Sequence, residues 1–321
     1  MDARALIGRP GLLPSVVYIA GYGRSGSTLL DTLLGSHPAM FGAGEVASFF
    51  ETWPDGGRCS CGQGYAECAF WPNVVSRAQA AFPALKEPSS EEITARTRRV
   101  ESSFSPLSSG SPSDRQFYGD LWRAMLSAIQ QESGKSIVVD SSKSSRAVSR
   151  RIWALSELVG AKVRVLHLVR DPRALMWSAV RGSNRLLEAG RPAALSGGVL
   201  RALVGWSLAN ASVHAARAQN PHLSFLQLRY EDLAGNPAHV LRGLGAFLDV
   251  DFEPVVERIA KQLPFDPGHG VGGNRMRRQG PIRIAVDEEW KQALPRYARV
   301  LASLSWPLAS QYGYDVLRSS N

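Results

Sequence analysis

The chain of 321 residues is 44% hydrophobic and 20% charged, which permits a full core and excludes collagen-like, coiled-coil and disulfide-scaffold proteins. Its formal net charge of +9 favours anionic partners: a phosphorylated ligand, nucleic acid or a membrane surface. Its 31 Arg against 6 Lys suit bidentate phosphate binding, although a codon bias in an Ala- and Gly-rich chain explains the same excess.

The cysteine count and the hydrophobic runs bear on the cellular compartment. Three cysteines cannot all pair within the chain, and no stretch approaches the roughly 18 apolar residues of a membrane helix. The apolar run 12–20 ends in a Gly/Ser loop rather than in a cleavage site. We therefore expect a cytoplasmic protein without a membrane span.

Short runs rich in Val, Ile and Leu predict buried strands, and each run is followed by turn residues and a segment of helical periodicity. Such alternation is typical of a parallel sheet covered by helices on both faces. The predicted strands are 16–20, 137–139, 163–169 and 223–228, and the predicted helices are 28–35, 145–159, 172–181, 199–219 and 236–248. The pattern predicts an α/β fold of three layers with a central parallel sheet flanked by helices.

Three polar segments interrupt this pattern. Residues 86–115 are rich in Ser, Pro and charge and predict an exposed insertion with one helix over 91–101; a second insertion is predicted near 52–72. Residues 188–198 are either a mobile lid or a plain surface loop. We expect a single domain over residues 1–321.

A Gly- and Ser-rich loop, residues 21–28, joins the first predicted strand to the first predicted helix. The free N–H groups and the dipole at such a helix N-terminus bind anions. No lysine precedes Ser27 and Thr28, which argues against an ordinary nucleotide triphosphatase and leaves the cationic role to Arg24. The alternative is a mere tight turn. The candidate anion-binding residues are Gly23, Arg24, Ser25, Gly26, Ser27 and Thr28.

A second basic site follows the third predicted strand. Arg170 stands where the strand ends and a helix begins, and Ser178 follows within that helix. The carboxyl ends of parallel strands meet at one sheet edge, where ligands of open α/β sheets bind. Two anion sites on one edge indicate a ligand with two separated phosphate groups.

These two motifs, in this order and spacing, resemble the sulfotransferase family that uses 3′-phosphoadenosine-5′-phosphosulfate (PAPS), and segments 229–233 and 273–290 are also similar to it. The resemblance implies a P-loop-like fold, the 5′-phosphosulfate on residues 23–28, the 3′-phosphate on Arg170 and Ser178, and a nucleotide contact from Tyr230. The first loop carries an arginine, Arg24, rather than a lysine. In this respect the chain is more similar to the tyrosylprotein and bacterial branches of the family than to the cytosolic branch that acts on small phenols.

Arg275 and Arg277 lie in a basic, Gly-rich segment and are expected to close over the 3′-phosphate, with a solvated basic loop as the alternative.

The resemblance also implies catalytic roles. Glu45 is similar to the catalytic glutamate of the tyrosylprotein branch and is assigned as general base, with His37 second; their alternatives are a helix-capping glutamate and a turn histidine. Lys143 and Arg24 are expected to stabilise the leaving phosphate, although Lys143 is alternatively an exposed loop lysine. No metal is expected if these cations supply enough positive charge.

The acceptor class stays open between a small molecule, a carbohydrate, a lipid and a peptide tyrosine. Trp53, Phe70 and Trp71 either line an acceptor pocket or belong to the core. Two other functions compete with sulfuryl transfer. A small-molecule kinase or other phosphotransferase would lack its P-loop lysine, and a nucleic-acid-binding protein is favoured by the net charge alone.

The three cysteines, Cys59, Cys61 and Cys68, have metal-like spacing. A zinc site needs four ligands, so His37 or Glu67 would have to complete it. The other interpretations are a redox-labile pair and a structural loop, of which the structural loop is favoured.

Overall fold

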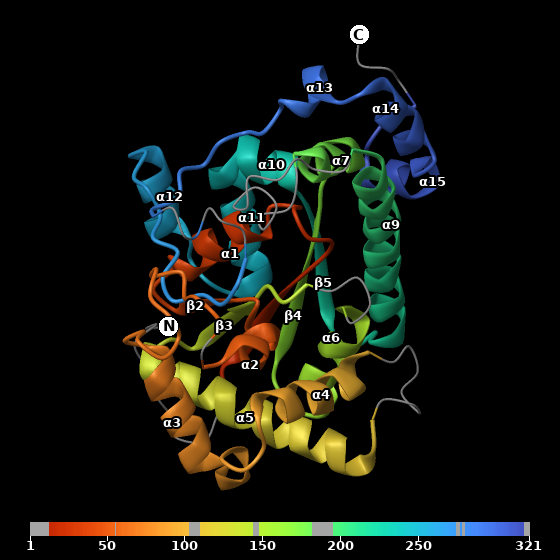
Figure 1. Ribbon diagram of the computed structural model, residues 1–321. Helices are drawn as coiled ribbons and strands as arrows, with labels where there is room; N and C mark the ends of the chain where they lie inside the picture. The colour runs from red at the N-terminus through yellow and green to blue at the C-terminus, as the bar shows by residue number, and fades with distance from the viewer. Residues whose placement is uncertain are drawn as a thin grey trace.

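A five-stranded parallel sheet forms the middle layer of the protein (Figure 1). The computed structural model describes residues 13–54, 56–102, 110–143, 148–181, 195–273, 277 and 280–317. The strand order is β2-β3-β1-β4-β5, and the strands are β1 (Ser15–Ala20), β2 (Met40–Gly44), β3 (Ile137–Asp140), β4 (Val163–Val169) and β5 (Ser224–Arg229). The predicted α/β fold with a central parallel sheet is confirmed.

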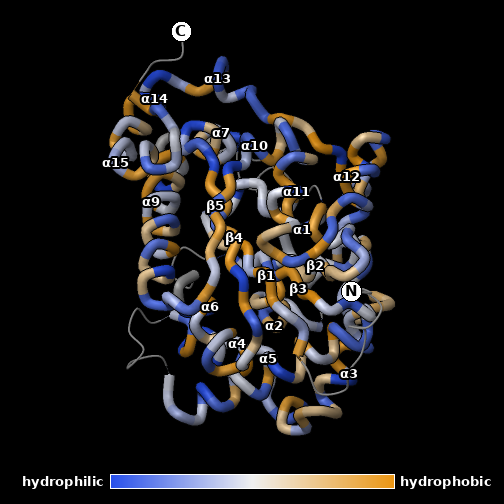
Figure 2. Tube along the Cα trace, turned by 180° about the vertical axis from the view of Figure 1, so that it is seen from behind, coloured by the Kyte–Doolittle hydropathy of each residue, from blue (hydrophilic) through white to orange (hydrophobic). Residues whose placement is uncertain are grey.

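The central strand β1 contributes side chains to both faces of the sheet. Val16 and Tyr18 belong to one hydrophobic core, whereas Val17 and Ile19 belong to another, as expected when successive strand residues point to opposite faces. Both sets are buried, so this strand is an unbroken apolar run without polar alternation. Figure 2 shows hydrophobic residues along the strands in the middle of the molecule.

Helices cover both faces of the sheet and one side of it. The first face packs against α2 (Phe49–Thr52), α3 (Trp71–Ala81), α4 (Ser90–Glu101), α5 (Pro112–Ser133) and α6 (Val148–Glu157). The second packs against α1 (Ser27–Gly35), α10 (Tyr230–Gly235), α11 (Pro237–Leu248) and α12 (Glu253–Ala260). A third cluster joins α7 (Pro172–Val180), α9 (Leu195–Gln219), α14 (Arg296–Ser303) and α15 (Trp306–Ala309), with α13 (Trp290–Ala293) close to α7.

Within the described ranges, no helix is both long and apolar enough to cross a lipid bilayer.

The predicted strands agree with the observed ones within one residue, and β2 is the strand that the sequence does not predict. Its five residues, Met-Phe-Gly-Ala-Gly, include two glycines and no β-branched residue, so they carry little strand propensity. The predicted helices are confirmed with small shifts at their ends, and the side chain of Asn236 caps α11. The start of the predicted helix 145–159 and most of the predicted loop 188–198 lie outside the described residues.

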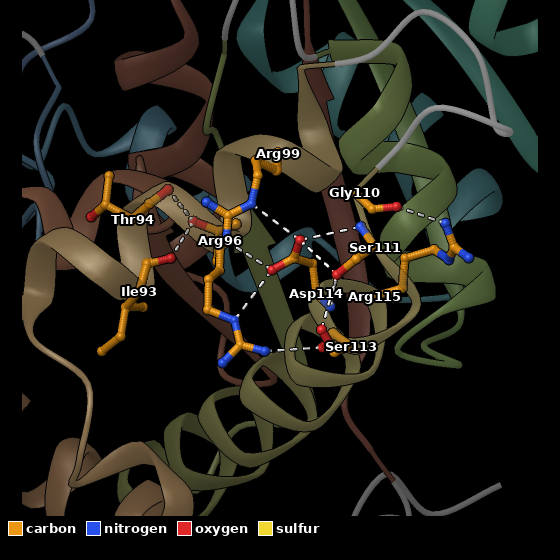
Figure 3. A network of polar contacts seen from close by, with 10 residues as sticks. Ile93, Thr94, Arg96, Arg99, Gly110, Ser111, Ser113, Asp114 and Arg115 are labelled. Atoms are coloured by element: carbon orange, nitrogen blue, oxygen red, sulfur yellow. Dashed lines mark hydrogen bonds and ion pairs between the residues drawn. The ribbon is translucent and has the colours of Figure 1, made fainter.

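The segment predicted as an exposed insertion is largely helical. Helix α4 confirms the prediction over 91–101, and α5 begins at Pro112 behind a capping box, in which Ser111 and Asp114 bond each other's backbone N–H groups. Figure 3 shows the Asp114 carboxylate between two guanidinium groups of α4. Arg99 bonds both carboxylate oxygens, at 2.9 and 3.1 Å, and Arg96 bonds Oδ1 at 3.3 Å. One carboxylate therefore caps α5 and joins it to α4.

The Asp114 carboxylate predicts a pH-dependent contribution to stability. Its bonds to Arg99, which outweigh the opposing effect of burial, hold its pKa well below the usual range. We expect Asp114→Asn to lower the free energy of unfolding by about 1–3 kcal/mol at neutral pH. Because the folded-state pKa is depressed, the difference between the two proteins is present above the ordinary aspartate pKa and shrinks as the pH falls. Chemical denaturation of both proteins, from neutral pH down to below the ordinary aspartate pKa, measures this difference in the free energy of unfolding.

Asp120→Asn is the matched control, since this aspartate lies on the same helix and pairs with the half-exposed Arg123 at 2.7 Å. An exposed pair of this kind contributes little, so we expect a change within about 0.5 kcal/mol. Equal effects of the two substitutions would contradict the role assigned to Asp114.

Candidate active site

The five strands bring candidate residues to one edge of the sheet, because all five are parallel. Glu45 follows β2, Lys143 lies just beyond β3, Arg170 follows β4, and Tyr230 follows β5. The loop 21–26 follows β1, the central strand. The strand order therefore places Glu45 and Lys143 on one side of this loop and Arg170 and Tyr230 on the other. Strands β2 and β4 are three spacings apart, roughly 14 Å.

Two glycines allow the loop to turn into α1. Gly21 has a φ of 130°, and a Cβ atom there would lie 2.3 Å from the carbonyl oxygen of Leu168. Gly26 has a φ of 91° and precedes α1, and its missing Cβ would lie 2.2 Å from the ring of Tyr230. The residue before α1 is Gly26, so no side-chain hydrogen bond caps this helix.

The loop also buries a hydroxyl that has no partner. Ser25 is 1% exposed, and among the described residues its Oγ has no hydrogen-bond partner. A buried polar atom in this state is costly unless something bonds to it. An oxyanion held by the loop and the helix N-terminus would supply that partner, so the residues fit an anionic group.

On the side of β4, the guanidinium groups of Arg170 and Arg181, which we call the Arg170 pocket, already hold a carboxylate. The buried Arg170 lies 4.2 Å above the ring of Tyr230 and donates to the backbone oxygen of Arg24 at 3.1 Å. Its Nη2 donates to Asp287 at 3.0 Å, and Arg181 donates to the same oxygen at 2.8 Å. Although burial raises the pKa of Asp287, the two arginines bring it below its usual value. Asp287 is thus an internal anion at the second predicted anion site.

Arg24 and Ser178, two of the residues predicted to bind an anion, contact each other. The Nη1 of Arg24 donates to the Ser178 carbonyl oxygen at 2.6 Å and to its Oγ at 2.8 Å. Arg24 is therefore directed toward α7 and not toward Lys143, with which the sequence analysis paired it. Its catalytic role stays a prediction.

On the side of β2, Lys143 and Glu45 form an ion pair with 3.4 Å between Nζ and Oε1. Burial lowers the pKa of Lys143, and the charge of Glu45 offsets this only in part. The backbone N–H of Glu45 donates to the carbonyl oxygen of Val271 at 2.7 Å, which fixes the start of the turn after β2. The pair combines a proton acceptor with a cation, as the predicted roles require.

A buried network supports the lysine loop, and the sequence did not indicate it. Asp140 accepts a hydrogen bond from the N–H of Ser142 at 2.8 Å and two from Arg151 at 2.7 and 2.9 Å. Arg151 also donates to Glu101 of α4 at 2.7 Å. The loop that carries Lys143 is therefore held from the interior of the protein.

His37 has a structural environment at the end of α1. Its Nδ1 accepts from the N–H of Ala39 at 3.1 Å, and its Nε2 lies 2.8 Å from the carbonyl oxygen of Asp251. Burial lowers its pKa. Both ring nitrogens are engaged by backbone groups, which favours the turn interpretation over the role of general base.

Arg277 lies in the interior and away from Arg170's pocket. It is 1% exposed and forms an ion pair with the buried Asp31 at 2.6 Å. The absence of side chains at Gly44 and Gly270 makes room for its guanidinium, since a Cβ at either would lie within 2.5 Å of Nη1. Its contact with the 3′-phosphate stays a prediction that these partners do not favour, and Arg275 lies outside the described residues.

The aromatic side chains near the cysteines divide between two environments. Phe70 and Trp71 are buried in the core, whereas Trp53 is partly buried against it. The core interpretation of Phe70 and Trp71 is confirmed.

The fold and this edge define an α/β protein with a Gly- and Ser-rich loop and paired cationic side chains at the carboxyl ends of its parallel strands. Residues 14–254 match the model of the sulfotransferase family, so the chain belongs to that family, as predicted. A curated relative, carbohydrate sulfotransferase 5 of Mus musculus, is 26% identical over 145 residues, which cover 41% of this chain and 36% of the relative. The match thus spans about a third of that relative's length.

Two solved structures are also similar. The sulfotransferase domain from the curacin biosynthetic pathway is 22% identical, with a TM-score of 0.48 over 94% of this chain and 99% of that one. The sulfotransferase domain of the Synechococcus PCC 7002 olefin synthase is 21% identical, with a TM-score of 0.49 over 96% and 98% of the two chains.

Proposed function

We propose that this sulfotransferase-family protein transfers the sulfuryl group of PAPS to a hydroxyl group of an acceptor. The observation that carries the proposal is the arrangement along the sheet edge. A Lys143–Glu45 pair lies on one side of an anion-binding loop, and the Arg170 pocket with its internal carboxylate lies on the other. A nucleotide with a 5′-phosphosulfate and a 3′-phosphate carries two separate anionic groups, one for the loop and one for Arg170.

The loop and the Arg170 pocket divide the binding of the donor. Residues 23–28 would hold the 5′-phosphosulfate, which gives the buried Ser25 hydroxyl a partner, and Arg170 and Ser178 would hold the 3′-phosphate. Tyr230, whose ring lies beside Gly26 of the loop, would contact the nucleotide. When bound, PAPS supplies an activated sulfur–oxygen bond to a phosphate leaving group.

Glu45 and Lys143 would carry the chemistry. The Glu45 carboxylate accepts the proton of the acceptor hydroxyl as its oxygen bonds to sulfur, and the Lys143 ammonium stabilises the negative charge that develops on the departing phosphate. Arg24 would add to this stabilisation only after leaving Ser178. In this proposal the two cations take the place of a catalytic metal ion.

The acceptor class is the least constrained part of the proposal. The mouse relative is named for carbohydrates, so a sugar hydroxyl is the first class to test. Lipid alcohols, other small molecules and peptide tyrosine are the alternatives.

The proposal predicts that Arg170→Ala weakens binding of adenosine 3′,5′-bisphosphate. A charge-assisted hydrogen bond contributes about 1.5–3 kcal/mol, so we expect a loss of roughly ten- to a hundredfold by calorimetric titration. Arg77→Ala is the charge-matched control, because Arg77 is a surface residue of α3 that pairs with Glu132 at 3.0 Å. Unchanged affinity, or stronger binding of ATP than of the bisphosphate, would favour a phosphotransferase instead.

Asp287→Asn is expected to have the opposite effect. The Asp287 carboxylate and a 3′-phosphate would compete for Arg170, so removing its charge raises affinity for the 3′,5′-bisphosphate by several-fold. Affinity for 5′-AMP, which lacks the 3′-phosphate, stays the same. Equal changes for both nucleotides would show that Asp287 does not lie in the 3′-phosphate site.

Glu45→Gln separates the two candidate bases. We expect kcat for transfer from labelled PAPS to a panel of sugars and phenols to fall by about 10²–10⁴-fold, with bisphosphate binding nearly unchanged. His37→Gln is expected to leave kcat per folded protein molecule unchanged. The reverse ranking would make His37 the base.

A further inference from the structure

Three cysteines and one histidine converge outside the catalytic edge. The side-chain ligand atoms of Cys59, Cys61, Cys68 and His269 all lie within 4.8 Å of one another. Cys59 and Cys68 are buried, Cys61 is exposed, and His269 is partly buried. The histidine is about 200 residues from the cysteines in the sequence, so only the fold brings the four groups together.

The distances fit a single tetrahedral ion. The sulfurs of Cys61 and Cys68 are 3.7 Å apart, and the Nδ1 of His269 lies 3.3 Å from the Cys68 sulfur and 3.6 Å from the Cys59 sulfur. Zinc bonds of about 2.3 Å to sulfur and about 2.0–2.1 Å to nitrogen place tetrahedral ligands about 3.8 Å apart for two sulfurs and about 3.5 Å apart for sulfur and nitrogen. These three distances are close to that spacing, and the other ligand atoms of the cluster lie within 4.8 Å of one another, so a small adjustment would complete the site.

Neighbouring groups hold the ligands in place. The His269 ring stacks on Phe70 with 5.3 Å between centroids, and its carbonyl oxygen accepts from the Trp71 indole at 2.8 Å. The N–H of Phe70 points at the Cys68 sulfur at 3.5 Å. Fixing ligand orientation through such outer contacts is typical of built metal sites.

We propose that Cys59, Cys61, Cys68 and His269 bind a structural Zn²⁺ ion. Three sulfurs and one imidazole nitrogen form a closed four-coordinate set, which suits zinc and leaves no open position for catalysis. The fourth ligand is His269, not His37 or Glu67, which the sequence analysis considered. A redox pair would use two of the cysteines and would give His269 no role.

The ion would join two segments that support the catalytic edge. Cys59 pairs with Val271 in a β-bridge, and the backbone N–H and hydroxyl of Ser60 both donate to the carbonyl oxygen of Gly270, at 3.1 and 3.0 Å. Val271 in turn bonds the backbone N–H of Glu45. Zinc would thus fix the segment on which the turn of Glu45 rests, and removing it would loosen that turn.

Metal analysis of the purified 321-residue chain tests the proposal. We expect about one zinc ion per chain by plasma mass spectrometry, and thiolate-to-cobalt absorption with a tetrahedral ligand-field band after exchange with Co²⁺. Cys61→Ser and His269→Ala are expected to lose the metal on dialysis against a chelator. Because Cys61 is exposed, its substitution provides a readout even where His269→Ala does not fold.

Ser60→Ala is the matched control, since it removes a hydrogen bond between the same two segments and keeps all four ligands. It should retain full zinc content. Wild-type protein from zinc-supplemented cells that contains no zinc and gives no cobalt thiolate absorption overturns the proposal. A Cys61–Cys68 disulfide in freshly isolated protein, or bound iron in place of zinc, overturns it as well. None of these readouts depends on sulfuryl transfer.

Discussion

The parallel direction of all five strands is the constraint on which the rest of the molecule depends. Because every strand runs the same way, every carboxyl end meets at one edge, and the side chains that follow the strands gather there. The strand order then decides which of them are neighbours. It puts the loop 21–26 in the middle, the Lys143–Glu45 pair beside β3 and β2, and the Arg170 pocket beside β4. The separation of the two cationic groups is a property of the sheet itself.

Three buried cations near this edge are paired with carboxylates. Arg170 forms an ion pair with Asp287, Arg277 with Asp31, and Lys143 with Glu45. An unpaired charge in these positions would be very unfavourable, so the protein provides internal anions. The pairs differ in depth: Arg277 and Asp31 are both 1% exposed, whereas the Asp287 and Glu45 side chains are 27% and 37% exposed. The more exposed carboxylates are the ones that a ligand can replace or use.

The sequence predicts the strands that are rich in β-branched residues and the anion loop, because these have strong local signals. It does not predict β2, since Met40–Gly44 has two glycines and no β-branched residue, although this strand positions Glu45. Asp287 and His269 were not predicted for a different reason. Each meets its partners across more than a hundred residues, as in the Arg170–Asp287 bond, so no spacing in the sequence marks it. A search for a fourth zinc ligand among all six histidines would have included His269 as a candidate.

A crystal structure of the protein with adenosine 3′,5′-bisphosphate tests the central claim most directly. The account predicts the 5′-phosphate on residues 23–28, the 3′-phosphate on Arg170 and Ser178, and the Asp287 carboxylate displaced from Arg170. A 3′-phosphate bound elsewhere, with the Arg170–Asp287 ion pair intact, would contradict the division of the sheet edge into two anion sites.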